Sequence, residues 1–159
     1  MSLKESLAQI KGRYGFIPIS NLRELVTHIA VQNHLELQGV KISKTLKPTT
    51  VVRSRKLFAI LILLALERHI ENLLDNGITD DIFPAHESDL SILEDDEDRH
   101  RFLVEQWTIP LPFHPEQNMN IPRNAILPFL SKERINYGTF GIVYKVRVAD
   151  GHLVNYQVG

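Results

Sequence analysis

Apolar side chains recur at helical spacing through the first part of the chain. In residues 2–11 they form one stripe, and Gly12 and Gly15 should stop this helix. A second helix should open after Pro18 and end before Gly39, because apolar residues again recur three or four positions apart. The stripe of this second helix consists of Leu22, Leu25, Val26, Ile29 and Ala30.

The most strongly apolar segment is LFAILILLAL, residues 57–66. We predict that it belongs to one helix from about Ser54 to Asn76, with Gly77 as its left-handed cap. A helix that is apolar on nearly every face must be covered by neighbours, so this one should form the centre of the core. Ten residues of helix rise about 15 Å, roughly half the hydrocarbon thickness of a bilayer. We therefore expect a buried helix and not a membrane span.

Charge is unevenly distributed along the chain. Residues 41–56 contain six basic residues and no acid, and Pro48 breaks them into a loop, whereas residues 87–98 contain seven acids and no Lys or Arg. The last four of these acids should complement the positive end of a helix that runs to Trp107. The basic segment could pair with the acidic run or meet phosphate on a partner, but exposed charge pairs contribute little. We therefore interpret both charged segments as solvated surfaces.

A dense set of prolines separates this helical region from a different pattern. Such density forbids a long helix or a central strand. We therefore predict a helical N-terminal domain at 1–107, a proline-rich linker at 108–127 and a strand-forming unit at 128–159. The prolines are Pro110, Pro112, Pro115, Pro122 and Pro128.

The pattern of residues 128–159 predicts three strands. They should cover Phe129–Asn136, Ile142–Val148 and His152–Val158, with Asp150-Gly151 as a tight turn between the last two. The predicted fold class is α+β, a mainly α-helical N-terminal domain followed by a partial three-stranded antiparallel sheet.

Composition narrows the functional classes. The 159 residues are 43% hydrophobic and 23% charged, with a net charge of −1, which is typical of a soluble globular protein and gives no electrostatic case for nucleic acid. The absence of cysteine excludes disulfides, thiolate catalysis and cysteine-ligated zinc. With no signal-peptide pattern at the N-terminus, a cytoplasmic or nuclear location is expected.

Indications of metal ligands in the sequence are weak. The seven histidines form no closely spaced ligand pair such as H-E-x-x-H, so ordinary surface or partly buried histidines are favoured. The acidic run lacks the alternating Asp/Asn positions and the central glycine of an EF-hand loop. We predict no metal site.

The strongest motif is INYGTFGIVYKV, residues 135–146. It resembles the glycine-rich loop of eukaryotic protein kinases, G-x-G-x-x-G-x-V. Gly138 and Gly141 fall on the second and third glycines and Val143 on the valine, and Phe140 stands where these kinases commonly place an aromatic. Asn136 replaces the first glycine.

This resemblance implies a hairpin whose backbone N–H groups face the phosphates of ATP, with the valine over the adenine ring. ATP is thus the expected cofactor, and the replacement at Asn136 implies that its binding is weak or absent in this chain. No catalytic residue is predicted. The candidate nucleotide-binding residues are Ile135, Asn136, Tyr137, Gly138, Thr139, Phe140, Gly141 and Val143.

The 159 residues contain none of the other kinase motifs, which are the V-A-I-K lysine, the helix glutamate, H-R-D and D-F-G. Residues 53–158 follow a layout similar to that of fungal proteins with a C-terminal kinase-like domain, which implies a filamentous fungus as the source. The expected function is therefore the N-terminal fragment of a fungal Ser/Thr-type protein kinase-like protein, pseudokinase-like and catalytically inactive in this chain.

The alternative is a non-catalytic helical protein–protein interaction module with a strand tail. Three strands without a covering helix leave an open sheet edge, which invites a protein partner or self-association. No nucleic-acid or membrane partner is expected under either hypothesis.

Overall fold

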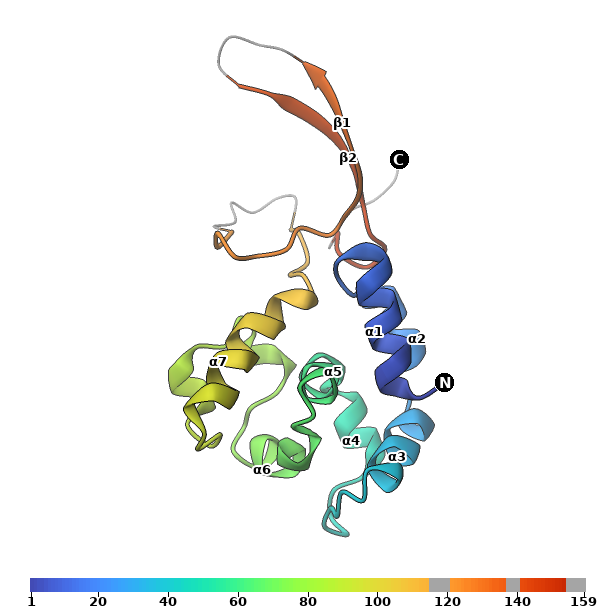
Figure 1. The fold of residues 1–159 in the computed structure, drawn as a ribbon, viewed down its shortest axis with the longest axis vertical. Helices are drawn as coiled ribbons and strands as arrows, with labels where there is room; N and C mark the ends of the chain where they lie inside the picture. Colours follow the sequence, from blue (N-terminus) through green and yellow to red (C-terminus); the bar gives the residue numbers. More distant parts are fainter. Residues whose placement is uncertain (115–120, 137–140, 154–159) are drawn as a thin grey trace.

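A helical body carries a two-stranded ribbon at one end (Figure 1). The computed structural model describes residues 1–114, 121–136 and 141–153, with the side chain of Asn136 left out. The elements are α1 (Leu3–Tyr14), α2 (Ile19–Leu25), α3 (His28–Leu37), α4 (Pro48–Val52), α5 (Arg55–Leu64), α6 (Ile70–Asp75), α7 (Asp96–Glu105), β1 (Phe129–Asn136) and β2 (Val143–Val148). Short 3₁₀ turns follow α5 and α6 and flank α7.

Helix α5 is the centre of the body, as the sequence predicts. Figure 1 shows it with α1 and α2 on one side and α7 on the other. Every side chain from Leu57 to Ile62 is fully buried. Burying each large apolar side chain contributes about 1.5–3 kcal/mol, so this one segment organises the core.

The N-terminus of α5 is capped from outside the helix. Ser54 makes no side-chain cap, and the carboxylate of Asp80 instead accepts the backbone N–H groups of Lys56 and Leu57 at 3.0 and 2.8 Å. Burial raises the pKa of Asp80 against these two hydrogen bonds, which act to lower it. Burial also lowers the pKa of the adjacent Lys56 to about 8, with the Asp80 charge opposing the shift. A residue beyond α6 thus satisfies backbone donors that α5 cannot satisfy itself.

The predicted single helix over 54–76 is wrong, because the chain breaks at Ala65. This residue has φ 58°, and the N–H of Leu66 donates to the carbonyl of Leu61 at 2.8 Å, which closes α5 as a left-handed cap. A 3₁₀ turn and α6 follow, and Gly77 then has the predicted positive φ of 77°.

Two smaller helix boundaries also differ. Gly12 lies inside α1, which ends at Gly15 with φ 77°. The predicted second helix is divided into α2 and α3, because the side chain of Thr27 accepts the N–H of Ala30 and starts a new helix. Part of the predicted basic loop forms α4, which begins at Pro48.

The acidic start of α7 matches its prediction. The Asp95 side chain accepts the N–H groups of Glu97 and Asp98 at 2.8 and 3.2 Å, and three acids lie in the first turn. Trp107 follows in a 3₁₀ turn and is 8% exposed. At the start of the expected linker, Thr108 is buried, and its carbonyl accepts the N–H of Ile17 at 2.7 Å.

The expected three-stranded sheet is wrong for the described residues. The strands β1 and β2 pair antiparallel close to their predicted bounds, but the described sheet contains two strands and the fold is mainly helical. His152, predicted to start the third strand, is instead fully buried against the helical body, and Leu153 makes an isolated bridge with Phe113. The rest of that predicted strand, residues 154–158, lies outside the described residues. Among the described residues, the start of the predicted third strand thus shows a buried side chain and one isolated bridge.

The break at Ala65 can be tested by whether a glycine substitution raises or lowers the free energy of unfolding. In Ala65→Gly, removal of Cβ should raise the free energy of unfolding by about 0.5–1 kcal/mol, because a left-handed conformation strains every L-residue. Ala65 is exposed, so no packing is lost. The measurement is urea unfolding followed by the fluorescence of Trp107, the only tryptophan.

Ala8→Gly is the matched control, since Ala8 is exposed within α1. It should lower stability by about 1 kcal/mol, the usual cost of glycine inside a helix. An equal loss in both variants would show that helix continues through Ala65.

Candidate functional site at the ribbon

The predicted nucleotide-binding residues lie at the far end of the β1–β2 ribbon. Asn136 pairs with Val143 as the last rung of the ladder, so the chain crosses between the strands over residues 137–142. Ile135 and Val143 are 56% and 48% exposed. The structure therefore brings Ile135, the backbone of Asn136 and Val143 to one end of one hairpin.

The central part of the motif is not described. Tyr137, Gly138, Thr139 and Phe140 lie outside the described residues. Gly141 is described, and a Cβ added there would meet no atom within 4 Å. Its small size is thus not required by packing within the described part of the chain.

The ribbon is irregular and carries an ordered cation–aromatic contact. Register shifts make Leu130 and Ile135 extra residues on β1, and such bulges increase the local twist. Lys132 places its Nζ 3.9 Å from the ring centroid of Tyr144, on the face that both residues share. This contact stabilises the pairing of two strands that have no cover on that face.

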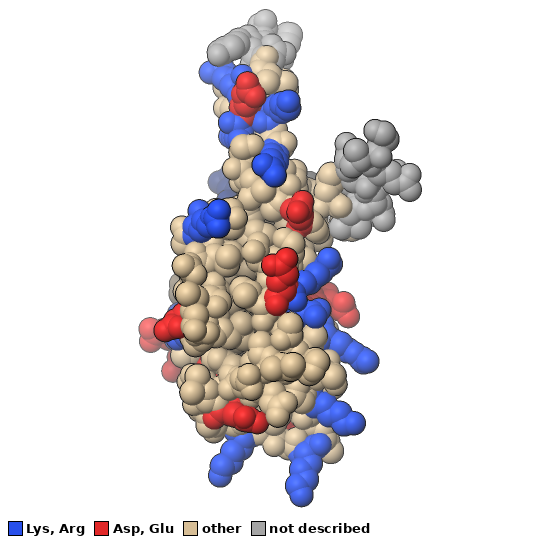
Figure 2. Space-filling view, turned by 90° about the vertical axis from the view of Figure 1, so that its right-hand side faces the viewer, with Lys and Arg blue, Asp and Glu red and all other residues tan. Residues whose placement is uncertain are grey.

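The ribbon is positively charged although the chain as a whole is not. The two strands contain four basic residues and one acid, Glu133, against a net charge of −1 for the whole chain. Figure 2 shows Lys and Arg side chains gathered on the ribbon, above a middle face of the body with few charges. The electrostatic environment of the hairpin therefore suits an anion. The basic residues are Lys132, Arg134, Lys145 and Arg147.

His152 holds the base of the ribbon to the helical body. Its side chain is fully buried, and its Nε2 accepts the N–H of Ile19 at 2.8 Å, at the start of α2. Pro18, which precedes α2, makes no side-chain cap, so the imidazole replaces one. The ring of Phe16 packs edge-on at a centroid distance of 6.3 Å.

Backbone contacts complete this anchor. The N–H of Ala149 donates to the carbonyl of Pro128 at 2.8 Å, and Phe113 donates to the carbonyl of His152. Gly151 has φ 86° and lies against Ile19, where an added Cβ would approach to 3.4 Å. The predicted Asp150-Gly151 turn exists, but it inserts a histidine into the body instead of starting a strand.

A second histidine, His34, is buried between helices, which the sequence pattern did not indicate. His34 of α3 places its Nε2 2.9 Å from Oε1 of Glu67, which lies in the turn after α5. Their side chains are 1% and 8% exposed. The two residues are 33 positions apart, so no local spacing could have indicated this pair.

The charged segments do not pair with each other in the described residues. The acidic run pairs with the helix that follows it: Arg99 contacts Glu87 and Asp96, and Arg101 contacts Asp98 at 3.4 Å. From the basic segment, Arg55 donates to the carbonyl of Val26 at 2.8 Å.

Metal sites and membrane-spanning helices are two further features that the described residues could contain. Residues 1–114, 121–136 and 141–153 contain no group of three His, Asp or Glu side chains able to hold a metal ion. None of the helices formed by these residues is both long and apolar enough to cross a bilayer.

Comparison with protein-family models, curated proteins and solved structures returned no match for this chain. The kinase resemblance therefore depends on the quoted residues and on the layout of the sequence around them.

The His152 anchor predicts a pH-dependent stability. Burial lowers the pKa of His152 to about 4, from an ordinary value near 6.5, with the nearby backbone carbonyls of Leu111 and Pro110 opposing the shift. Between these two pH values the unfolded chain binds a proton that the folded chain does not, so stability is present above pH 6.5 and lost as the pH falls toward 4. The loss should reach about 3 kcal/mol at most.

His152→Gln tests this prediction, because glutamine can still accept the N–H of Ile19 but does not titrate. Urea unfolding at pH 7 and pH 5 should show a clearly smaller loss in His152→Gln than in the unaltered protein. His100→Gln is the control, since His100 is exposed and should change nothing. An identical pH dependence in all three proteins would contradict the anchor.

Proposed function

We propose that this chain is the leading part of a fungal Ser/Thr-type protein kinase-like protein. In this proposal β1, the loop after it and β2 are the glycine-rich hairpin that covers ATP. The helical body is a non-catalytic prefix that holds the hairpin through His152.

The observation that carries the proposal is the register of the ribbon. The pairing of Asn136 with Val143 in an antiparallel ladder supports the proposal, because a phosphate-covering loop connects two neighbouring antiparallel strands. A motif of this kind on a helix, or across two unconnected strands, could not fold over a nucleotide.

Charge and exposure are compatible with the same ligand. The basic side chains of both strands favour a triphosphate, and apolar side chains at Ile135 and Val143 are open to an adenine ring. Asn136 tolerates unusual backbone angles better than most residues, so it is a workable substitute for the first glycine.

The remaining parts of a phosphotransfer site are not among these residues. A kinase holds the α- and β-phosphates with a lysine of the next strand and needs metal-binding acids and a catalytic aspartate. The hairpin alone provides backbone donors and charge. Phosphotransfer by this chain is therefore not proposed, and ATP contact is limited to the hairpin.

An interaction module is the second candidate, favoured by the apolar surface of the ribbon. Leu130, Ile142 and Tyr144 are 38%, 51% and 40% exposed, and within the described residues the sheet contains two strands, so each has an edge with no neighbouring strand. A two-stranded ribbon is marginal by itself, so a protein partner or a second copy that adds a strand would stabilise it.

The transcript distinguishes the two candidates. Sequencing the messenger RNA beyond codon 159 should reveal an in-frame continuation that encodes a V-A-x-K strand and later H-R-D and D-F-G. A stop codon with no such sequence downstream would contradict the kinase proposal and favour the interaction module.

Nucleotide binding by this chain should be weak. Calorimetric titration with Mg-ATP should give a dissociation constant above about 1 mM, less than about 4 kcal/mol of binding free energy, because the phosphate-binding lysine is absent. ATP hydrolysis and peptide phosphorylation should equal those of a buffer blank. Micromolar ATP affinity would contradict the view that the hairpin is the sole nucleotide contact in this chain.

A further inference from the structure

A cavity lies between the start of α1 and helix α3, in the part of the body away from the ribbon (Figure 1). Its volume is about 370 Å³, which is within the usual range of small-molecule sites. Five of the nine lining residues are apolar and four are polar. The lining residues are Met1, Ser2, Leu3, Ser6, Leu25, Ala30, Asn33, His34 and Leu37.

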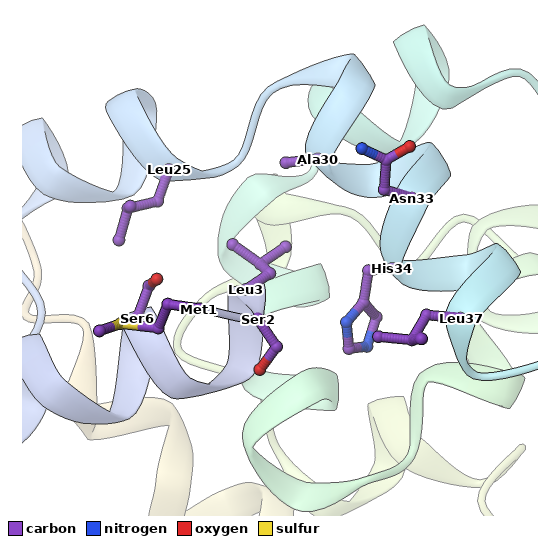
Figure 3. A pocket seen from close by; sticks show the side chains of 9 residues that line it. All are labelled: Met1, Ser2, Leu3, Ser6, Leu25, Ala30, Asn33, His34 and Leu37. Atoms are coloured by element: carbon purple, nitrogen blue, oxygen red, sulfur yellow. The ribbon is translucent and has the colours of Figure 1, made fainter.

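The imidazole of His34 is one of the polar groups that line this cavity. Figure 3 shows its ring extending from α3 between the first residues of α1 and the side chain of Leu37. The side chain is 1% exposed, and its Nδ1 has no hydrogen-bond partner in the described part of the chain. Burying a polar atom without a partner is unfavourable, so a ligand that satisfies it gains affinity.

Glu67 determines which kind of group Nδ1 can bind. Burial acts to raise the pKa of Glu67, but the pKa is lowered overall, chiefly by the hydrogen bond with His34, which favours the ionised carboxylate. An ionised carboxylate can only accept, so Nε2–H of His34 donates to Oε1. In the neutral form of an imidazole whose Nε2 carries the proton, Nδ1 presents a lone pair and pairs with a donor.

We propose that this cavity binds a small, uncharged and mainly apolar molecule with one hydroxyl or N–H group, which donates a hydrogen bond to Nδ1 of His34. The apolar lining from Leu3, Ala30 and Leu37 would cover the hydrocarbon part of the ligand. A carboxylate or phosphate is disfavoured, because it would direct oxygen lone pairs at the lone pair of Nδ1. This site is independent of the nucleotide hairpin proposed above.

Two probes that differ only in their ability to donate test the proposal: 1-hexanol and its isomer 1-methoxypentane. The full chain, labelled with ¹⁵N, would be titrated with each, and the amide signals of Leu3, Ala30 and Leu37 followed together with the ring nitrogens of His34. 1-Hexanol should give saturable shifts at these amides and at Nδ1. The ether should bind at least about fivefold more weakly, the loss expected for one hydrogen bond.

Two variants separate this site from general apolar contact. In His34→Phe a ring remains but both ring nitrogens are lost, so no acceptor is left and the preference for the alcohol should disappear. Ala30→Leu adds volume to the cavity from a partly exposed position and should weaken both probes. Ala8→Leu adds the same volume to a different surface hollow and should leave binding unchanged.

Each possible result of these titrations either supports or overturns the proposal. Equal affinity for alcohol and ether in the unaltered protein, or an alcohol preference that persists in His34→Phe, would overturn the proposal. So would the absence of saturable shifts with either probe, provided that the amide spectrum shows the folded protein. Circular dichroism of each variant verifies that the helical content is retained.

Discussion

The structure depends on the burial of helix α5. Its side chains from Leu57 to Ile62 are fully buried, and α1, α2, α4 and α7 all contact this helix. Such a helix has no solvent face of its own, so its neighbours are positioned by the need to cover it. The break at Ala65 follows from the same need, because α6 turns back to pack Ile70 and Leu73 into this core, where both are fully buried. A continuous helix would have carried those two side chains away from it.

Buried polar groups mark where this apolar body is joined together. Asp80 caps α5, the His152 imidazole caps α2, and His34 bonds Glu67 between α3 and the turn after α5. In each case a side chain from a distant part of the chain satisfies a group that burial would leave without water. These contacts give direction to packing that hydrophobic burial alone would leave less specific. The pattern is incomplete at four buried atoms of the described residues, namely Nδ1 of His34, Oε2 of Glu67, Nε1 of Trp107 and Nδ1 of His152. His34 is also one of the residues that line the cavity.

The ribbon contrasts with the body that holds it. Its strands expose apolar side chains at Ile135 and Val143 and carry a surplus of basic residues, whereas its base is fixed by Ala149 and His152. A firmly held base with an exposed, charged far end is suited to contact with something outside the described fold. In the kinase proposal this is a nucleotide together with the rest of an N-lobe; in the alternative it is a partner strand. Both proposals use the same hairpin, and they differ in what completes it.

The sequence by itself determined the local elements whose signals lie within a few residues: the apolar segment of α5, the acidic start of α7, the cap at Gly77 and the strands that pair Asn136 with Val143. It also located the candidate hairpin, although four of the proposed site residues, from Tyr137 to Phe140, lie outside the described residues. Tertiary structure decided what depends on distant partners: the left-handed Ala65, the burial of His152 against the helical body, and the pairing of His34 with Glu67. Periodicity reports which face of a segment is apolar, but it carries no information on which distant group will satisfy a buried donor or acceptor. That choice is made only when the segments pack, because only then is water removed from those groups.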